Sequence, residues 1–166
     1  MFTPLGNQSK LLLTGFLAPT PSLLNLEDRY ELPTYEWRLK DANWNFFSFE
    51  KSKGRIAFVS FWASWHLPSK ASLERIQALH KRYGNQIDFY LVTDEERDPV
   101  LAFMERNQFH LPVTYRVVED AVPFPTKDLG YTYIIDKSGQ IILETSRVSD
   151  WTATSFTEAL KALLQQ

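Results

Sequence analysis

Apolar residues form two short, nearly continuous runs in the middle of the chain. Residues 56–62 read Ile-Ala-Phe-Val-Ser-Phe-Trp, and residues 87–92 read Ile-Asp-Phe-Tyr-Leu-Val. Strands that are covered on both faces have this pattern, whereas strands with one solvated face alternate apolar and polar residues. The two runs therefore predict two buried strands of a central sheet.

Four other segments favour helices. After Pro68, apolar residues recur at helical spacing up to position 83, with Lys, Glu and Arg on the opposite face and Gly84 as a natural stop. This pattern predicts an amphipathic helix. Further helices are predicted over 98–109, with Asp98 as N-cap and Pro99 in the first turn, over 152–164, and over the short segment 23–30.

Shorter patterns supply the remaining strands. Residues 35–39 alternate apolar and polar, and with residues 43–48 they predict an opening β-hairpin around a turn at 41–42. Residues 113–118 predict a short strand, and residues 131–136 and 140–144 predict a second hairpin. The order of elements predicts an α/β fold in which a mixed central sheet is flanked by helices, with the first hairpin as an N-terminal extension.

The first 33 residues are irregular and rich in proline, so we divide the chain into a leader, 1–33, packed on or preceding the domain, and a domain, 34–166. An apolar run begins at Leu11 but stops at Pro19, well short of the ~20 residues that a membrane-spanning helix needs. One preceding Lys and a weak cleavage pattern do not favour a signal peptide.

Composition agrees with one folded domain. The chain has 166 residues, of which 44% are hydrophobic, and its formal charge is −2. Lys and Arg are scattered rather than clustered, so the sequence gives no basic surface for nucleic acid. There is no cysteine. That excludes disulfides, thiolate nucleophiles and cysteine-ligated metal sites, but it leaves the compartment open.

The segment from Phe61 to Ser69 reads F-W-A-S-W-H-L-P-S. It resembles the thioredoxin active-site junction, F-W-A-x-W-C-x-P-C, in which a strand leads into a long helix. Residues 133–141 read Y-I-I-D-K-S-G-Q-I and are similar to the F-x-I-D-x-x-G-x-I of the TlpA/ResA-like branch, whose members are membrane-anchored, periplasmic thiol-disulfide oxidoreductases. The resemblance covers about 34–166. It implies a thioredoxin-like fold, a periplasmic or cell-envelope location and a possible membrane anchor upstream of this chain.

The departures from this family pattern are concentrated at its redox positions. His66 stands where the nucleophilic cysteine would be, Ser69 at the resolving cysteine, Ser72 at a position that is often acidic, and Gly130 at the cis-proline. Exchange needs a thiolate to attack a disulfide and a second thiol to resolve the product, so the family activity cannot run here. We also predict a trans Leu129–Gly130 bond, because a non-proline cis bond costs about 2.5–4 kcal/mol.

These substitutions favour a binding function over an enzymatic one, and we assign no catalytic residue within the redox-motif positions His66-Leu67-Pro68-Ser69. The expected binding face is Trp65, His66, Pro68 and Gly130, and the expected partner is a protein or peptide. An alternative is a repurposed enzyme in which His66, kept neutral at a helix amino end, acts as a base toward Ser69. A third possibility is an accessory protein of an active, cysteine-bearing relative.

Other candidate residues have simpler structural interpretations. His80 and His110 lack the spacing of a metal site, and neither a metal nor a cofactor is expected. The acidic residues 94–96 with Asp98 follow a strand at the carboxyl edge of the sheet and could hold a cation, but they are interpreted as a solvated loop and a helix cap. The proline-rich segment 122–125 would form a stiff rim near the active-site face. The hairpin aromatics are expected either in an exposed partner-binding patch or packed on the leader: Trp37, Trp44, Phe46, Phe47 and Phe49.

Overall fold

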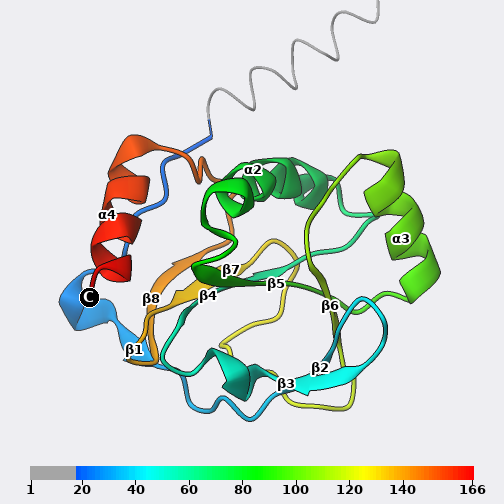
Figure 1. Cartoon of the computed structure of the whole chain (residues 1–166), viewed down its shortest axis with the longest axis horizontal. Helices are drawn as coiled ribbons and strands as arrows, with labels where there is room; N and C mark the ends of the chain where they lie inside the picture. The colour runs from blue at the N-terminus through cyan, green and yellow to red at the C-terminus, as the bar shows by residue number, and fades with distance from the viewer. Residues whose placement is uncertain (1–17) are drawn as a thin grey trace, which may run out of the picture.

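In a computed structural model of the chain, residues 18–166 can be described, and they form one eight-stranded mixed sheet with three α-helices (Figure 1). The strand order is β1-β8-β7-β4-β5-β6-β2-β3. Residues 1–17 lie outside the described part, and with them the apolar run that starts at Leu11 and the question of a signal peptide. No helix within 18–166 has the length and apolarity that a membrane crossing requires.

The centre of the sheet is built from the two apolar runs. β4 (Ile56–Phe61) and β5 (Ile87–Thr93) pair in parallel, and every residue of β4 is buried. β6 (Val113–Arg116) continues in parallel beside β5, and β7 (Thr132–Ile135) lies antiparallel to β4 and is joined by a hairpin to β8 (Gln140–Thr145). The predicted buried strands and the second hairpin are therefore confirmed.

The edges of the sheet differ from the prediction in detail. The opening hairpin is present but short, with β2 (Arg38–Lys40) and β3 (Phe46–Ser48). The helix predicted over 23–30 is wrong: a single 3-10 turn, η1 (Leu26–Asp28), is followed by β1 (Tyr30–Glu31). The backbone here pairs with β8, so sheet hydrogen bonds replace helical ones.

All three helices pack on one face of the sheet, as Figure 1 shows. They are α2 (Leu67–Tyr83), α3 (Arg97–Arg106) and α4 (Thr154–Leu164). The apolar positions of α2 that face the sheet are almost fully buried, and this confirms the predicted amphipathic helix: Leu73, Ile76 and Leu79.

α3 departs from its prediction at both ends. Its N-cap is Glu96 rather than Asp98, so Pro99 lies two residues deeper in the first turn, where backbone N–H groups have no helical partner to lose. The helix ends before Phe109, because the Asn107 side chain donates to the Phe103 carbonyl and Gln108 has a φ of +56°.

Loops and the opening hairpin cover the second face of the sheet. Trp37 and Phe49 are buried there, and both pack edge-on against the Phe124 ring. Phe124 also stacks on Tyr133, with ring centroids 4.7 Å apart. The segment 122–125 therefore fills this core with Phe124 instead of forming only a rim. Of the other hairpin aromatics, Phe47 is half-buried, and Trp44 and Phe46 are exposed.

Candidate functional site

The site suggested by the sequence lies where β4 passes into α2, at the edge of the sheet where β4, β5 and β6 all have their carboxyl ends. The Gly130 N–H donates to the Phe61 carbonyl at 2.8 Å, and the Phe61 N–H donates to the Tyr131 carbonyl at 2.9 Å. Two segments that are distant in the sequence are thereby side by side. We call this region, residues 62–69 with Gly130, the junction face.

His66 and Ser69 form a direct pair within it. His66 is the N-cap residue of α2, and its Nδ1 lies 2.8 Å from Ser69 Oγ. The Ser69 hydroxyl also accepts a hydrogen bond from the Ala63 N–H at 3.3 Å. The hydroxyl can donate its proton to Nδ1 or accept a second hydrogen bond from it, depending on which ring nitrogen carries the hydrogen.

The pair lacks two elements of a serine catalytic site. Within residues 18–166, no carboxylate is hydrogen-bonded to either ring nitrogen of His66. Ser69 is only 1% exposed, so its Oγ cannot meet a substrate unless the start of α2 opens. A catalytic triad requires a base that is oriented by a third group and a nucleophile that is within reach of the substrate.

The junction face exposes large apolar side chains instead. Trp65 is 70% exposed and Leu67 is 84% exposed, whereas Trp62 is buried in the core. The Trp65 ring lies edge-on to the His66 ring, with centroids 6.1 Å apart. Pro68 is also exposed. Gly130 reaches the junction only through Phe61, since no hydrogen bond links it to His66 or Ser69 among the described residues.

Glu95 holds the junction in place and was missed by sequence reasoning. Its carboxylate accepts hydrogen bonds from the Ser64 N–H at 2.8 Å, from Ser64 Oγ at 2.5 Å and from Thr93 Oγ1 at 3.1 Å. We call this arrangement the Glu95 clamp. The interpretation of the acidic segment as a solvated loop is therefore wrong for Glu95. The sequence feature that points to this role is the position of Glu95 directly after a buried strand, at the edge where β4 also ends.

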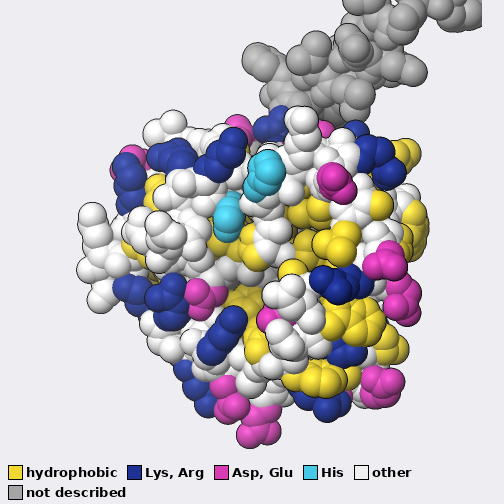
Figure 2. All heavy atoms as spheres, turned by 45° about the vertical axis from the view of Figure 1, so that its right-hand side comes forward, with side chains coloured by type: hydrophobic (Ala, Val, Ile, Leu, Met, Phe, Trp, Pro, Cys, Tyr) yellow, Lys and Arg dark blue, Asp and Glu magenta, His cyan; other side chains and the backbone are white. Residues whose placement is uncertain are grey.

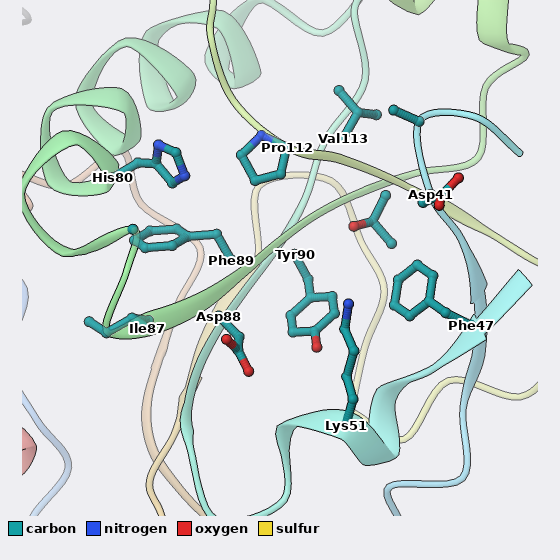
Figure 3. A pocket seen from close by; sticks show the side chains of 13 residues that line it. Asp41, Phe47, Lys51, His80, Ile87, Asp88, Phe89, Tyr90, Pro112 and Val113 are labelled. Carbon is teal, nitrogen blue, oxygen red and sulfur yellow. The ribbon is translucent and has the colours of Figure 1, made fainter. Parts of the chain in front are cut away.

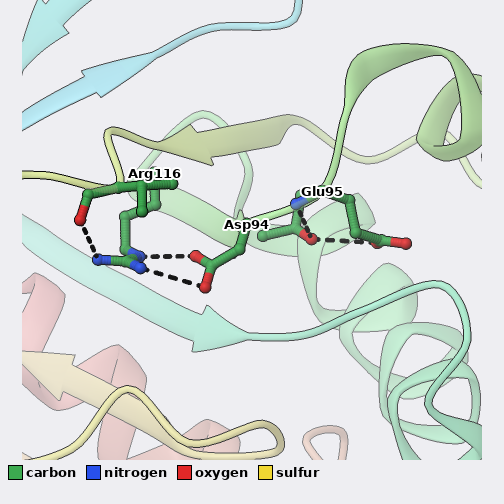
Figure 4. A network of polar contacts seen from close by, with 5 residues as sticks. Asp94, Glu95 and Arg116 are labelled. Carbon is green, nitrogen blue, oxygen red and sulfur yellow. Dashed lines mark hydrogen bonds and ion pairs between the residues drawn. The ribbon is translucent and has the colours of Figure 1, made fainter.

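A second polar link joins the neighbouring strands at the same edge. The Arg116 guanidinium donates to both carboxylate oxygens of Asp94, at 2.6 and 3.2 Å, and to the Val118 carbonyl at 3.3 Å (Figure 4). The Arg116 side chain is 5% exposed and that of Asp94 is 59% exposed. This link ties the ends of β5 and β6 together.

The other two histidines lie elsewhere. His80 packs edge-on against Phe89 at 5.0 Å, and burial lowers the pKa of its imidazole. His110 is exposed, and its backbone N–H donates to the Gln77 side chain at 2.7 Å. Within residues 18–166, histidines and carboxylates nowhere gather in groups of three that could hold a metal ion.

Gly130 has a backbone conformation that proline cannot adopt. Its φ is +93°, whereas the proline ring fixes φ near −65°. All peptide bonds in the described part are trans, so the predicted trans Leu129–Gly130 bond is confirmed. A Cβ built at Gly130 would meet only the Ser146 carbonyl, at 3.6 Å, so conformation and not space favours glycine here.

Comparisons with known proteins give the fold. No protein-family model matches the chain. A thioredoxin from Borreliella burgdorferi is 33% identical over 73 residues, which cover 43% of this chain and 57% of that protein, so the match spans little more than half of the relative's length.

Solved structures match over most of the chain. A DsbF homologue from Corynebacterium diphtheriae has a TM-score of 0.67 at 17% identity, with coverage of 87% of this chain and 93% of its own. A secreted thiol-disulfide isomerase from Corynebacterium glutamicum scores 0.66 at 14% identity, with coverage of 88% and 90%. A putative DsbE from Chlorobium tepidum scores 0.65 at 16% identity, with coverage of 81% and 95%. The fold of residues 18–166 is thioredoxin-like.

Proposed function

We propose that this chain is a redox-inactive thioredoxin-like domain that binds a protein or peptide partner through its junction face. The observation that carries the proposal is the exposure of Trp65 and Leu67, at 70% and 84%, in a protein without cysteine. Large apolar side chains at this degree of exposure mark interaction sites when they are grouped, and tryptophan is enriched among the residues that dominate binding energies.

The surrounding polar contacts support a binding role, because they make the junction rigid. The Glu95 clamp fixes Ser64, the residue directly before Trp65, and the His66–Ser69 pair fixes the start of α2. A surface that is already ordered loses little conformational entropy when a partner binds.

A cell-envelope location is part of the proposal, with a membrane anchor upstream of this chain as a possible extension. It is supported by the resemblance of 133–141 to the TlpA/ResA-like branch and by the secreted isomerase among the structural neighbours. An active thioredoxin-like protein in the same compartment is one partner that fits, since the chain would then act as its accessory.

Peptide selection tests the binding surface. A phage-displayed library of random peptides is selected on the purified chain, and the enriched peptides are then measured against the double variant Trp65→Ala/Leu67→Ala. We expect a loss of about tenfold or more in affinity, as for the loss of central apolar contacts. Leu101→Ala is the matched control, because Leu101 is an exposed apolar residue on α3. Peptides that bind the double variant and the wild type equally would refute the proposal.

An insulin reduction assay tests the redox part. The wild type is expected to be inert, since it has no thiol. The double variant His66→Cys/Ser69→Cys separates two causes of inactivity, the missing thiols and a changed docking surface. Activity in this variant would show that only the thiols are missing, whereas continued inactivity would show that the docking surface near Gly130 has also diverged. Reduction by the wild type itself would overturn the proposal.

The His66–Ser69 distance of 2.8 Å supports one second candidate, an enzyme with Ser69 as nucleophile. Such a serine reacts covalently with a fluorophosphonate probe, and the reaction disappears in Ser69→Ala and His66→Ala. Burial of Ser69 and the lack of a carboxylate on His66 weigh against this function. Mass spectrometry that finds no adduct after long incubation would exclude it.

A further inference from the structure

Charged side chains of both signs are mixed on the side of the molecule that carries α3 and the β2–β3 hairpin (Figure 2). A cavity of about 400 Å³ against residues 87–90 of β5 is mixed in the same way (Figure 3). Its walls carry Lys51 beside Asp41 and Asp88, and three of the four strand residues are buried. Neither feature therefore selects a partner by charge.

A second cavity, of about 460 Å³, lies between two segments that are distant in the sequence. One wall is the segment before β2, residues 33–36, and the other is the loop after β6, residues 119–123. We call this cavity the acidic groove. Most of its lining residues are exposed or half-buried, so it opens to solvent. Among the described residues, every charged side chain that lines it is a carboxylate: Glu36, Glu119 and Asp120.

One of these three carboxylates is already paired. Arg38 donates to both carboxylate oxygens of Asp120 at 3.1 Å, in the fork geometry that suits a guanidinium and a carboxylate. Within residues 18–166, no hydrogen bond or ion pair reaches the carboxylate of Glu36, and Glu119 acts on Arg38 only through space. One guanidinium against three carboxylates leaves the groove negative, so its charge favours a cationic ligand.

The remaining walls of the acidic groove are apolar and firmly held. The loop wall is anchored by Phe124, which stacks on Tyr133 in the core, and the Arg38–Asp120 pair ties this loop to β2. Walls that are already ordered lose little conformational entropy when a ligand binds. An arginine or lysine side chain fits such a site, because its aliphatic stem packs on apolar surface while its charged head stays at the polar rim. The apolar lining residues are Pro33, Ala121, Val122 and Pro123.

The groove continues into a neighbouring cavity, which makes it longer than one side chain. This cavity, of about 450 Å³, shares Glu36 and Asp120 with the groove and extends along β3, where Phe46 is 59% exposed. Its further carboxylate, Glu50, is paired with Lys53 at 3.4 Å. Two adjoining cavities with an exposed aromatic ring favour a chain segment over a small free cation.

We propose that the acidic groove binds a basic segment of a partner protein. An arginine or lysine of that segment lies between Glu36 and Glu119, which come from opposite walls, and its stem packs on Val122. A neighbouring apolar residue of the segment packs on Phe46. The groove shares no residue with the junction face, so the inference stands independently of the proposed function.

The experiment selects phage-displayed random peptides on the full chain and measures the enriched peptides against the double variant Glu36→Gln/Glu119→Gln. Both side chains are exposed, so these substitutions leave the fold intact. Glu74→Gln/Glu158→Gln is the matched control, because it removes two exposed carboxylates from α2 and α4 and changes the net charge equally. We expect enriched peptides with Arg or Lys beside an apolar residue. Their affinity should fall about tenfold in the groove variant and stay unchanged in the control.

NMR chemical-shift mapping then locates the bound peptide, with the largest changes expected at residues 33–36 and 119–123. Free L-arginine at the same concentration should not displace it, and displacement would overturn the inference in favour of a small cationic ligand. Selection without basic residues, equal losses in the two double variants, or shifts confined to other regions would also overturn it. Peptides that depend on Trp65 and Leu67 but not on the groove carboxylates would support the junction face alone, so the two proposals fail separately.

Discussion

The two ends of β5 are built in opposite ways. At its carboxyl end, side chains close the sheet edge: the Glu95 clamp holds Ser64, and Arg116 bridges to Asp94. At its amino end, residues 87–90 pair with β4 but not with β6, and a network of Ser52, Tyr90 and Asp88 lies beside them. The comparison teaches that polar side chains tie three strands together where the junction face is displayed, whereas at the other end β5 is held by β4 and by one small network.

The largest loss of stability is expected from breaking the Asp94–Arg116 ion pair at the carboxyl end of β5. Asp94→Ala leaves the nearly buried Arg116 guanidinium with only the Val118 carbonyl, so the free energy of unfolding should fall by about 3 kcal/mol. Arg116→Met is the informative control, because it leaves a carboxylate that is already 59% exposed and should cost only about 1 kcal/mol. Urea denaturation measures both, and equal losses would contradict this account.

The Glu95 clamp should contribute somewhat less to stability. Glu95→Gln replaces a carboxylate that accepts three hydrogen bonds with an amide whose NH₂ group faces donors, at a cost of about 2 kcal/mol. Exchange of the Ser64 amide hydrogen should accelerate at the same time. Glu96→Gln, at an exposed neighbour whose side chain caps nothing, should change stability by no more than about 0.5 kcal/mol. An unchanged Ser64 exchange rate would show that the clamp does not order the junction.

The stability of the protein should be less sensitive to substitutions near the amino end of β5. Ser52→Ala removes the hydroxyl that hydrogen-bonds both Asp88 and the buried Tyr90 hydroxyl, and we expect a loss of about 1 kcal/mol. Thermal unfolding compares it with Ser155→Ala, an exposed serine in the first turn of α4. A loss larger than that of Glu95→Gln would reverse the proposed contrast between the two ends.

The smallest effect on stability is expected to appear only at alkaline pH. Burial raises the pKa of Tyr90 and of Tyr133 to about 12, above the value of about 10 for an unfolded chain. The unfolded state therefore loses these protons first, and stability that is complete below pH 10 should decline as the pH rises toward 12. Tyr90→Phe should flatten this decline when unfolding is followed across that range, with pH 7–9 as the internal control. A decline that is as steep in Tyr90→Phe would exclude Tyr90 as its source.

Local patterns predicted the centre of this fold well. Residues 56–62 and 87–92 are apolar on both faces and became β4 and β5, and the F-W-A-x-W pattern placed the strand-to-helix junction. The edges were harder to predict, because β1 exists only through its pairing with β8, more than 100 residues away. Propensity alone could not choose between a helix and a strand for residues 23–30.

The candidate site, like the fold, was predicted only where its residues follow a local pattern. The sequence proposed Trp65, His66, Pro68 and Ser69 because they lie within one recognisable pattern, and it proposed Gly130 from the family resemblance. It missed the Glu95 clamp, because Ser64 and Glu95 are 31 residues apart and meet only once two strands end at one edge. It also did not predict that β6 starts too late to pair with residues 87–90 of β5.

The left-handed backbone at Gly130 also matters for any attempt to engineer disulfide exchange into this chain. Exchange would need two thiols at positions 66 and 69, because a single thiol cannot resolve a mixed disulfide. A proline at 130 would in addition require the Leu129–Tyr131 backbone to be rebuilt, since the proline ring fixes φ near −65° and Gly130 has +93°. Two side-chain substitutions would therefore supply the thiols, whereas the proline would demand a new main-chain conformation.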